Sequence, residues 1–293
     1  MLPSVLYANY LTQLISSLVT VTFNSMTLYD QFKQLKTNTQ LTMVLTHVFL
    51  HLIFAFPTFA HSAYGLYAIG DFKRNHDIIF WTGNFAYSAI IVTGLVDMFL
   101  ALDRYFAISH PISYQYKFKN KYTSLSLFIC LTAVVAMVII IICHKIESPP
   151  EAVIFASHVD QSVIYAHTTV NIVFACINVV ITVVFMVKLR KFSQDLRKTS
   201  ASKQGKNSDL MKANIIVIYQ MILEIIFAIT PMFVNAVVKF AFGWNWPMIL
   251  GPYVITSLSV YIFTCSILYR MKLGMKATPN AVLSTVNVRS SRP

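Results

Sequence analysis

Long runs of apolar residues alternate with short polar gaps along the whole 293-residue chain. Because an α-helix rises 1.5 Å per residue, about 20 apolar residues cross the hydrocarbon core of a bilayer. Seven runs reach this length, at approximately residues 4–29, 40–69, 78–105, 122–143, 161–187, 213–238 and 247–269. The pattern predicts an all-α membrane protein: one seven-transmembrane helix bundle spanning residues 1–293, with a short tail over 270–293.

Composition supports a membrane location. Only 12% of the residues are charged, about half the share of a soluble domain. The formal charge of +12 does not indicate nucleic-acid binding, because the basic residues lie in the gaps between apolar runs, as cytoplasmic loops require. All four cysteines lie inside apolar runs, so we expect buried small hydrophobes and no disulfide framework.

The positions of Lys and Arg predict the orientation. With the amino terminus outside, 19 of the 23 basic residues fall on the cytoplasmic side and four outside. The gap at 188–212 holds eight of them. It is expected to be a cytoplasmic loop that attracts the anionic lipids of the inner leaflet. We therefore predict an external amino terminus, a cytoplasmic carboxyl terminus and a first run that is retained as a span.

The most informative stretch is Leu-Asp-Arg-Tyr-Phe-Ala-Ile-Ser-His-Pro at 102–111, where the third run meets a basic segment. Charges at the edge of a hydrocarbon span are costly unless they are paired or lie at a water boundary. A desolvated pair of Asp103 and Arg104 can be closed, or opened in favour of another acceptor, and so can act as a switch. The alternative is that Arg104 is only an anchor that reaches the headgroups.

This stretch and the seven spans resemble the G-protein-coupled receptor superfamily. Short loops, small size and many aromatic residues are most similar to the nematode serpentine chemoreceptors, of class BC or a neighbouring class. The resemblance implies a receptor and not an enzyme. Its partners would be a small odorant- or pheromone-like ligand, a heterotrimeric G protein and membrane lipids. It also implies a multi-pass protein of the plasma membrane, in a sensory neuron or cilium, without a cofactor.

In that superfamily, the arginine that matches Arg104 is held by its acidic neighbour at rest and is released toward the G protein on activation. The residues that the resemblance assigns to coupling are Asp103, Arg104, Tyr105, Pro111, Lys188, Arg190 and Tyr269. The chain departs from the common pattern in three places. It lacks the cysteines of the outer disulfide, the tryptophan before Pro231, and the Asn-Pro that normally precedes the tyrosine matched by Tyr269.

Ionisable residues also lie deep inside the runs. Asp97 is seven residues before Arg104, or roughly 10 Å into the membrane, and His47 and His51 lie at a similar depth on the second run. They form either a cluster that repacks on activation or a static link between helices. Glu224, about 18 Å deep, is a ligand contact, a switch element or a structural hydrogen-bonding group.

Polar and aromatic residues in the outer third of the predicted bundle are expected to line a small-molecule site. They are His61, Asn84, Tyr87, Ser88, His167, Asn171, Asn235 and Tyr253. No zinc-ligand or hydrolase motif occurs, so neither a metal site nor catalysis is predicted. A seven-span transporter or ligand-gated channel is the alternative, although no internal repeat supports it. A receptor-like protein that has lost signalling remains a third possibility.

Overall fold

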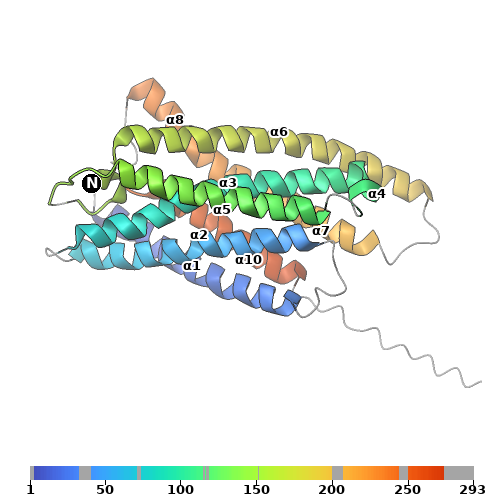
Figure 1. Cartoon of the computed structure of the whole chain (residues 1–293), viewed down its shortest axis with the longest axis horizontal. Helices are drawn as coiled ribbons and strands as arrows, with labels where there is room; N and C mark the ends of the chain where they lie inside the picture. The colour runs from blue at the N-terminus through green and yellow to red at the C-terminus, as the bar shows by residue number, and fades with distance from the viewer. Residues whose placement is uncertain are drawn as a thin grey trace, which may run out of the picture.

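The computed structural model describes residues 3–32, 41–70, 74–114, 116, 119–150, 152–199, 207–243 and 250–273. Long helices run side by side along the longest axis of the molecule (Figure 1). Their bounds are α1 (Pro3–Phe32), α2 (Thr42–Gly70), α3 (His76–Ser109), α5 (Lys119–Cys143), α6 (Gln161–Thr199), α7 (Asn207–Glu224), the π-helical η4 (Ile225–Ile229), α8 (Thr230–Phe242) and α10 (Tyr253–Leu273). Two short helices, α4 (Pro111–Ser113) and η3 (Phe155–His158), lie in the connections. The described chain contains no β-strand, only an isolated bridge between Lys145 and Val159.

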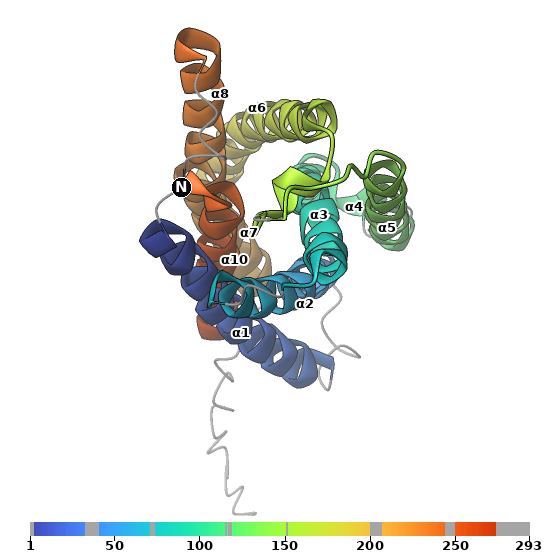
Figure 2. The ribbon, with the colours of Figure 1, turned by 90° about the vertical axis from the view of Figure 1, so that its left-hand side faces the viewer.

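Six of the described helices are long and apolar enough to cross a membrane. They lie within α2, α3, α5, α6, the continuous α7–η4–α8 rod, and α10. The end-on view shows α5 at the periphery, outside α3, and α8 projecting away from the other helices (Figure 2). The helix α1 is 30 residues long and packs along α2 and α10, but it is more polar than the six.

The described helices differ from the predicted spans at several boundaries. The helix α6 continues to Thr199 and α7 begins at Asn207, whereas residues 188–212 were predicted to form a loop. Residues 188–199 contain no Gly or Pro and are rich in Lys, Leu, Arg and Gln, which favour helix. The helix α10 starts at Tyr253, after Gly251 turns the chain with a φ of 76°. The predicted span begins near 247, where residues 244–249 lie outside the described part of the chain.

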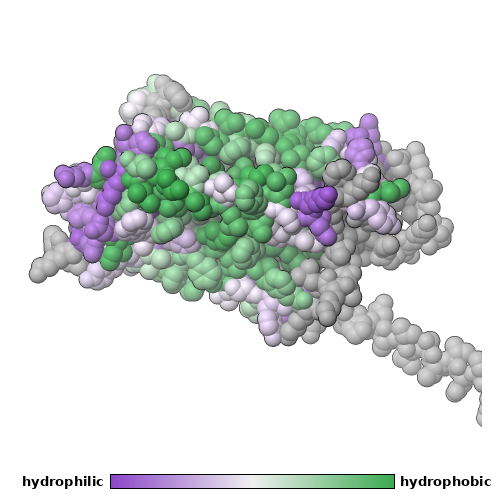
Figure 3. Space-filling model, viewed as in Figure 1, coloured by the Kyte–Doolittle hydropathy of each residue, from purple (hydrophilic) through white to green (hydrophobic). Residues whose placement is uncertain are grey.

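The surface is far more apolar than that of a soluble protein, and the interior also buries many polar side chains. In α1, the buried side chains include Gln13, Thr20 and Asn24, while Ile15 and Leu18 are more than half exposed. On the face shown in Figure 3, the middle of the surface is mostly apolar, and hydrophilic residues gather toward the two ends. An apolar surface of this extent is stable in lipid and not in water. The fold is therefore that of a multi-pass membrane protein.

A proline explains the π-helical segment between α7 and α8. Pro231 has no N–H to donate to the carbonyl of Phe227, four residues earlier. The Thr230 N–H instead reaches back five residues to the carbonyl of Ile225, and the Phe227 carbonyl accepts a hydrogen bond of 2.5 Å from Ser257 Oγ on α10. A neighbouring helix thus satisfies the group that the proline leaves free, as expected for a proline within a membrane.

The loop between α5 and α6 is held in place without a disulfide. All four cysteines are free thiols. The loop is anchored by backbone hydrogen bonds from Ile146 N to His158 O (3.0 Å) and from Asp160 N to His144 O (3.1 Å). In addition, Phe155 is fully buried, with its ring 4.6 Å from that of Tyr87 on α3. Aromatic packing therefore joins this loop to α3, where a disulfide does so in the common receptor pattern.

Candidate functional site

The carboxyl-terminal end of α3 contains a buried ion pair. Asp103 and Arg104 are almost completely inaccessible. Arg104 Nε donates to Asp103 Oδ2 at 2.9 Å, and a second guanidinium nitrogen contacts the same oxygen. The other carboxylate oxygen accepts a hydrogen bond from the hydroxyl of Tyr114. Because burial raises the pKa of Tyr114, this hydroxyl stays protonated and acts as a donor.

The other residues that were assigned to coupling lie on several elements. Tyr105 is partly buried, with its ring edge-on to Phe106. Pro111 begins α4, directly after α3 ends. Lys188 and Arg190 are exposed on α6.

A second buried cluster links four helices and is called the polar network below. Its members are His47 on α2, Asp97 on α3, Gln220 on α7, and Tyr261 and Tyr269 on α10. Asp97 Oδ1 lies 2.5 Å from His47 Nε2 and accepts from Gln220 Nε2 at 2.6 Å. Asp97 Oδ2 accepts from Tyr261 at 3.0 Å. The predicted proximity of Asp97 and His47 is therefore present, and Tyr269 belongs to this network.

Tyr269 closes the network by contacting two of its members. Its hydroxyl donates to Gln220 Oε1 at 2.8 Å and lies 3.0 Å from His47 Nδ1. His51 packs beside His47, with 4.1 Å between the ring centroids. Glu224, one turn beyond Gln220, is buried and accepts a hydrogen bond of 2.5 Å from Asn178 on α6. Every one of these contacts joins two different helices except the pair of histidines, so the network stabilises the bundle as a whole.

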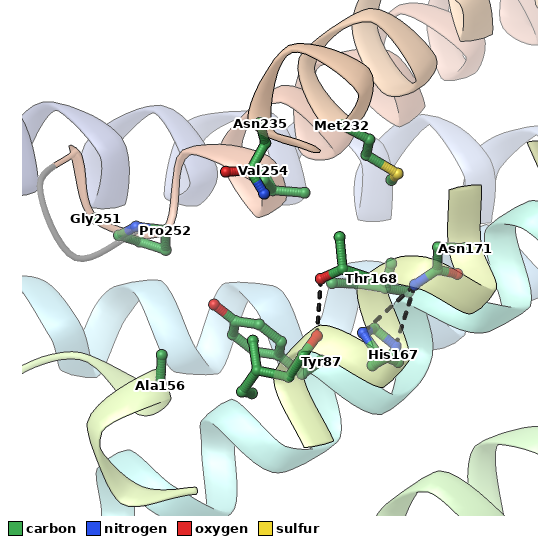
Figure 4. A pocket seen from close by; sticks show the side chains of 12 residues that line it. Tyr87, Ala156, His167, Thr168, Asn171, Met232, Asn235, Gly251, Pro252 and Val254 are labelled. Carbon is green, nitrogen blue, oxygen red and sulfur yellow. Dashed lines mark hydrogen bonds between the residues drawn. The ribbon is translucent and has the colours of Figure 1, made fainter. Parts of the chain in front are cut away.

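A cavity of about 40 Å³ lies between α3, α6, α8 and the start of α10, shown in Figure 4. It is lined by Tyr87, Ile90, Ala156, Ile164, His167, Thr168, Asn171, Met232, Asn235, Gly251, Pro252 and Val254. The lining is mostly apolar with a few polar groups, as is usual for small-molecule sites. Asn171 Nδ2 lies 3.3 Å from His167 Nε2, and Asn235 faces them from α8 (Figure 4).

A smaller cavity of about 20 Å³ shares Ile90, Asn171 and Met232 with the first one. It is also lined by Asp97 and Glu224. The two cavities therefore adjoin each other and extend from Tyr87 and His167 to Asp97 in the polar network. A separate cleft of about 340 Å³ lies near the start of α1 and residues 152–157 of the α5–α6 loop.

Four of the eight predicted pocket residues line the larger cavity: Tyr87, His167, Asn171 and Asn235. The other four lie elsewhere. His61 Nδ1 is 3.2 Å from Thr82 Oγ1. Asn84 donates to the carbonyl of Val138 on α5 at 3.4 Å and accepts from Ser88 at 3.1 Å. Tyr253 begins α10, next to lining residues.

Four residues of these clusters were not predicted: Tyr114, Asn178, Gln220 and Tyr261. A signal for two of them is present in the sequence. Gln220 lies four residues before Glu224, and Tyr261 eight before Tyr269, spacings that place each pair on one helix face. Tyr114 and Asn178 have no comparable signal, because their partners come from distant residues.

The fold and these clusters define a multi-pass membrane protein with a small, mostly apolar cavity and a buried charge pair. The family model described as "Serpentine type 7TM GPCR chemoreceptor Srbc" matches residues 2–273. The chain belongs to this family, which confirms the predicted resemblance to nematode serpentine chemoreceptors. The family is one of receptors and not of enzymes. A search of curated proteins found no match to the chain.

Proposed function

We propose that this chain is a chemosensory G-protein-coupled receptor of the plasma membrane. It binds a small external molecule in the cavity between α3, α6, α8 and α10, and it activates a heterotrimeric G protein through Asp103 and Arg104. The observation that carries the proposal is the closed, buried Asp103–Arg104 pair in a chain that belongs to a chemoreceptor family. Such a pair is stable only while its partners stay together, so its opening is a discrete event.

The helix α1 is the remaining span in this proposal, which gives seven with an external amino terminus. Its polar side chains face protein: Gln13 donates to Thr256 on α10 at 2.8 Å, and Gln31 to the carbonyl of Leu273 at 2.8 Å. Asp30 pairs with Arg270 at 2.5 Å. The two helices thus run parallel, as the first and seventh spans of an alternating bundle do. The excess of basic residues at the Arg104 end supports a cytoplasmic location for that end.

The cavity supports a ligand of low molecular weight. Its volume of about 40 Å³ holds a few water-sized probes, so a larger ligand must move α8 or the α5–α6 loop. Tyr87, His167 and the amides of Asn171 and Asn235 provide an aromatic surface with hydrogen-bonding groups. A compact, mostly apolar molecule with one or two polar atoms fits this lining best.

Coupling follows from the position of the polar network between the two sites. The smaller cavity joins the ligand site to Asp97, and Asp97 lies on the same helix as Arg104, seven residues away. A ligand that displaces α8 changes the position of Gln220 through the continuous α7–η4–α8 rod. The network then repacks, α3 moves relative to α7 and α10, and Arg104 becomes available to the G protein.

The transporter and channel alternative needs a continuous route between the two ends of the bundle. The two cavities between α3, α6 and α8 are small, and the polar network begins at Asp97, which lines the smaller one. A signalling-deficient receptor would retain ligand binding without nucleotide exchange. Both alternatives therefore differ from the proposal in a measurable way.

The test is agonist-dependent nucleotide exchange on a G protein that is reconstituted with the receptor in vesicles, after a ligand screen with a promiscuous G protein. Arg104→Ala should abolish exchange while ligand binding and surface expression persist. Lys191→Ala, which removes a single exposed charge on α6, is the matched control and should retain exchange. Normal exchange by Arg104→Ala would overturn the switch assignment. Ligand-evoked current in vesicles without G protein would instead support the channel.

A further inference from the structure

His51 is a buried histidine without a hydrogen-bonding role in the described chain. It is completely inaccessible, and neither of its ring nitrogens has a hydrogen-bond partner among the described residues. Its ring contacts are with other rings: His47, Tyr261 and Tyr269. A buried imidazole that only fills space is costly, and a phenyl or leucyl side chain would fill the same space without that cost. Its position therefore calls for a function of the nitrogen atoms.

The hydrogen bonds of the polar network leave one position for a positive charge next to His51. Tyr269 has a single hydroxyl proton, which it donates to Gln220 Oε1. The nearby His47 Nδ1 must then carry a proton and donate it to the Tyr269 oxygen. In the neutral ring, His47 Nε2 consequently presents a lone pair, and it faces the carboxylate oxygen Asp97 Oδ1 at 2.5 Å. The amide nitrogen of Gln220 contacts both acceptors, at 2.6 Å from Asp97 Oδ1 and 2.9 Å from His47 Nε2. Because the two acceptors lie only 2.5 Å from each other, they still require a proton or a metal cation between them.

Three ligand atoms converge on that position. One nitrogen each from His47 and His51 and one carboxylate oxygen from Asp97 lie within 4.8 Å of one another. His47 and His51 are one helical turn apart on α2, and Asp97 is contributed by α3. Two imidazoles and one carboxylate form a donor set that suits Zn²⁺ and other borderline transition metals better than Na⁺, Mg²⁺ or Ca²⁺.

The surroundings of the three ligands also fit a bound metal. Metal-ligating histidines usually donate their second N–H to an oxygen acceptor, as His47 does to Tyr269. The second oxygen of Asp97 is fixed by Tyr261. Glu224 lines the same small cavity as Asp97, which places a second carboxyl group near the proposed ligands. That cavity shares lining residues with the ligand cavity and reaches Asp97.

We propose that His47, His51 and Asp97 form a binding site for a divalent transition-metal cation, with Zn²⁺ as the representative ion. The cation takes the position of the proton that His47 and Asp97 otherwise share. Motif analysis of the sequence does not reveal the site, because the third ligand lies 50 residues away on another helix. Since its ligands join α2 and α3 beside α7 and α10, an occupied site strengthens the contact between these helices.

The experiment is calorimetric titration of Zn²⁺ into the full-length receptor in lipid nanodiscs, purified with a histidine-free tag. We expect one equivalent to bind, and Co²⁺ in its place to give the visible absorption bands of a low-coordinate site. His51→Phe keeps a ring of similar size, removes both nitrogens, and should weaken binding by roughly 100-fold or more. Absence of stoichiometric binding, or unchanged affinity of His51→Phe, would overturn the proposal.

Two controls separate this site from other histidines. His61→Phe alters another buried histidine of α2, and His158→Phe alters the histidine whose ring lies 5.4 Å from that of His76. Both should retain the affinity of the unmodified receptor, and loss of binding in His158→Phe would assign the metal to the α5–α6 loop instead. If His51→Phe does not fold, X-ray absorption of the Zn²⁺-loaded receptor decides. Two imidazole nitrogens at about 2.0–2.1 Å support the site, and an all-oxygen shell refutes it.

Discussion

Ser257 on α10 donates a hydrogen bond of 2.5 Å to the carbonyl oxygen of Phe227, the acceptor that Pro231 leaves without an intrahelical donor. This contact joins the π-helical part of the α7–η4–α8 rod to the last helix. Pro231 resembles the proline of span six in the receptor superfamily. In this chain, the contact gives that proline a structural partner.

The hydrogen bond from Ser257 to Phe227 should contribute much less to stability once Pro231 is replaced. Ser257→Ala should lower stability by about 1 kcal/mol, because it leaves the partly buried carbonyl of Phe227 without its donor. In a Pro231→Ala background the new N–H can satisfy Phe227, so Ser257→Ala should cost much less. A double-mutant cycle of thermal stability in detergent measures the coupling. Additive effects would show that the two residues are independent.

Loss of the Tyr114 hydroxyl should raise basal signalling. This hydroxyl donates to Asp103 and so helps to hold the closed pair. Removing about 1 kcal/mol of resting-state stabilisation increases the active fraction about fivefold. The measurement is ligand-free nucleotide exchange by Tyr114→Phe in vesicles. Tyr116→Phe, at a position that is 85% exposed, is the matched control. Equal basal rates in the two variants would contradict the prediction.

Tyr261→Phe should destabilise the bundle by about 1–3 kcal/mol, because it removes the donor to Asp97 Oδ2 in a buried environment. The same substitution at Tyr219, which is 51% exposed, should have little effect. Thermal unfolding of both variants in the same detergent provides the comparison. Similar midpoints would mean that the Tyr261 hydroxyl does not contribute to the network.

The α5–α6 loop should loosen as the pH falls below neutrality. Burial, followed by the neighbouring His76 and Lys145, lowers the pKa of His158 to about 4, and Asp77 opposes this only in part. Between the ordinary pKa near 6.5 and the folded value, the unfolded loop binds a proton that the folded loop does not. Stability is therefore complete above pH 6.5 and declines toward pH 4, with a loss of roughly 2 kcal/mol at pH 5.

Hydrogen exchange of the loop backbone between pH 7 and pH 5, corrected for the intrinsic rate, measures this change. The pH dependence should flatten in His158→Phe and persist in His144→Phe, where the substituted residue is exposed. A slope that is unaffected by His158→Phe would assign the effect to another group.

Gly83→Ala should change the shape of the ligand cavity, although Gly83 is not among its lining residues. A Cβ at position 83 would lie 2.7 Å from the Cβ of Phe155, so the aromatic side chain must move away from Tyr87. We expect a loss of about 1–3 kcal/mol together with weaker ligand responses. Gly70→Ala, where nothing lies within 4 Å, should be neutral. Combining Gly83→Ala with Phe155→Ala should cost less than the sum of the two.

The sequence was sufficient to predict the helices, because a bilayer demands long apolar runs. It also predicted the pairing of Asp97 with His47, because both lie at a similar depth. It did not predict how each helix is rotated about its own axis. That rotation decides that Asn171 and Asn235 line the cavity whereas Asn84 points to α5. The network could be predicted only in part for the same reason, since Gln220 comes from a helix whose orientation no local pattern reveals.

The buried polar stripe of α1 has a consequence for how the protein is made. The groups that satisfy Asn9, Gln13 and Gln31 belong to the chain between Leu250 and Leu273, which is synthesised after the other described helices. During synthesis, α1 therefore waits at or near the translocation machinery with its amides unpaired, until α10 arrives. A premature stop before residue 250 should leave even the earliest helix without a stable position in the membrane.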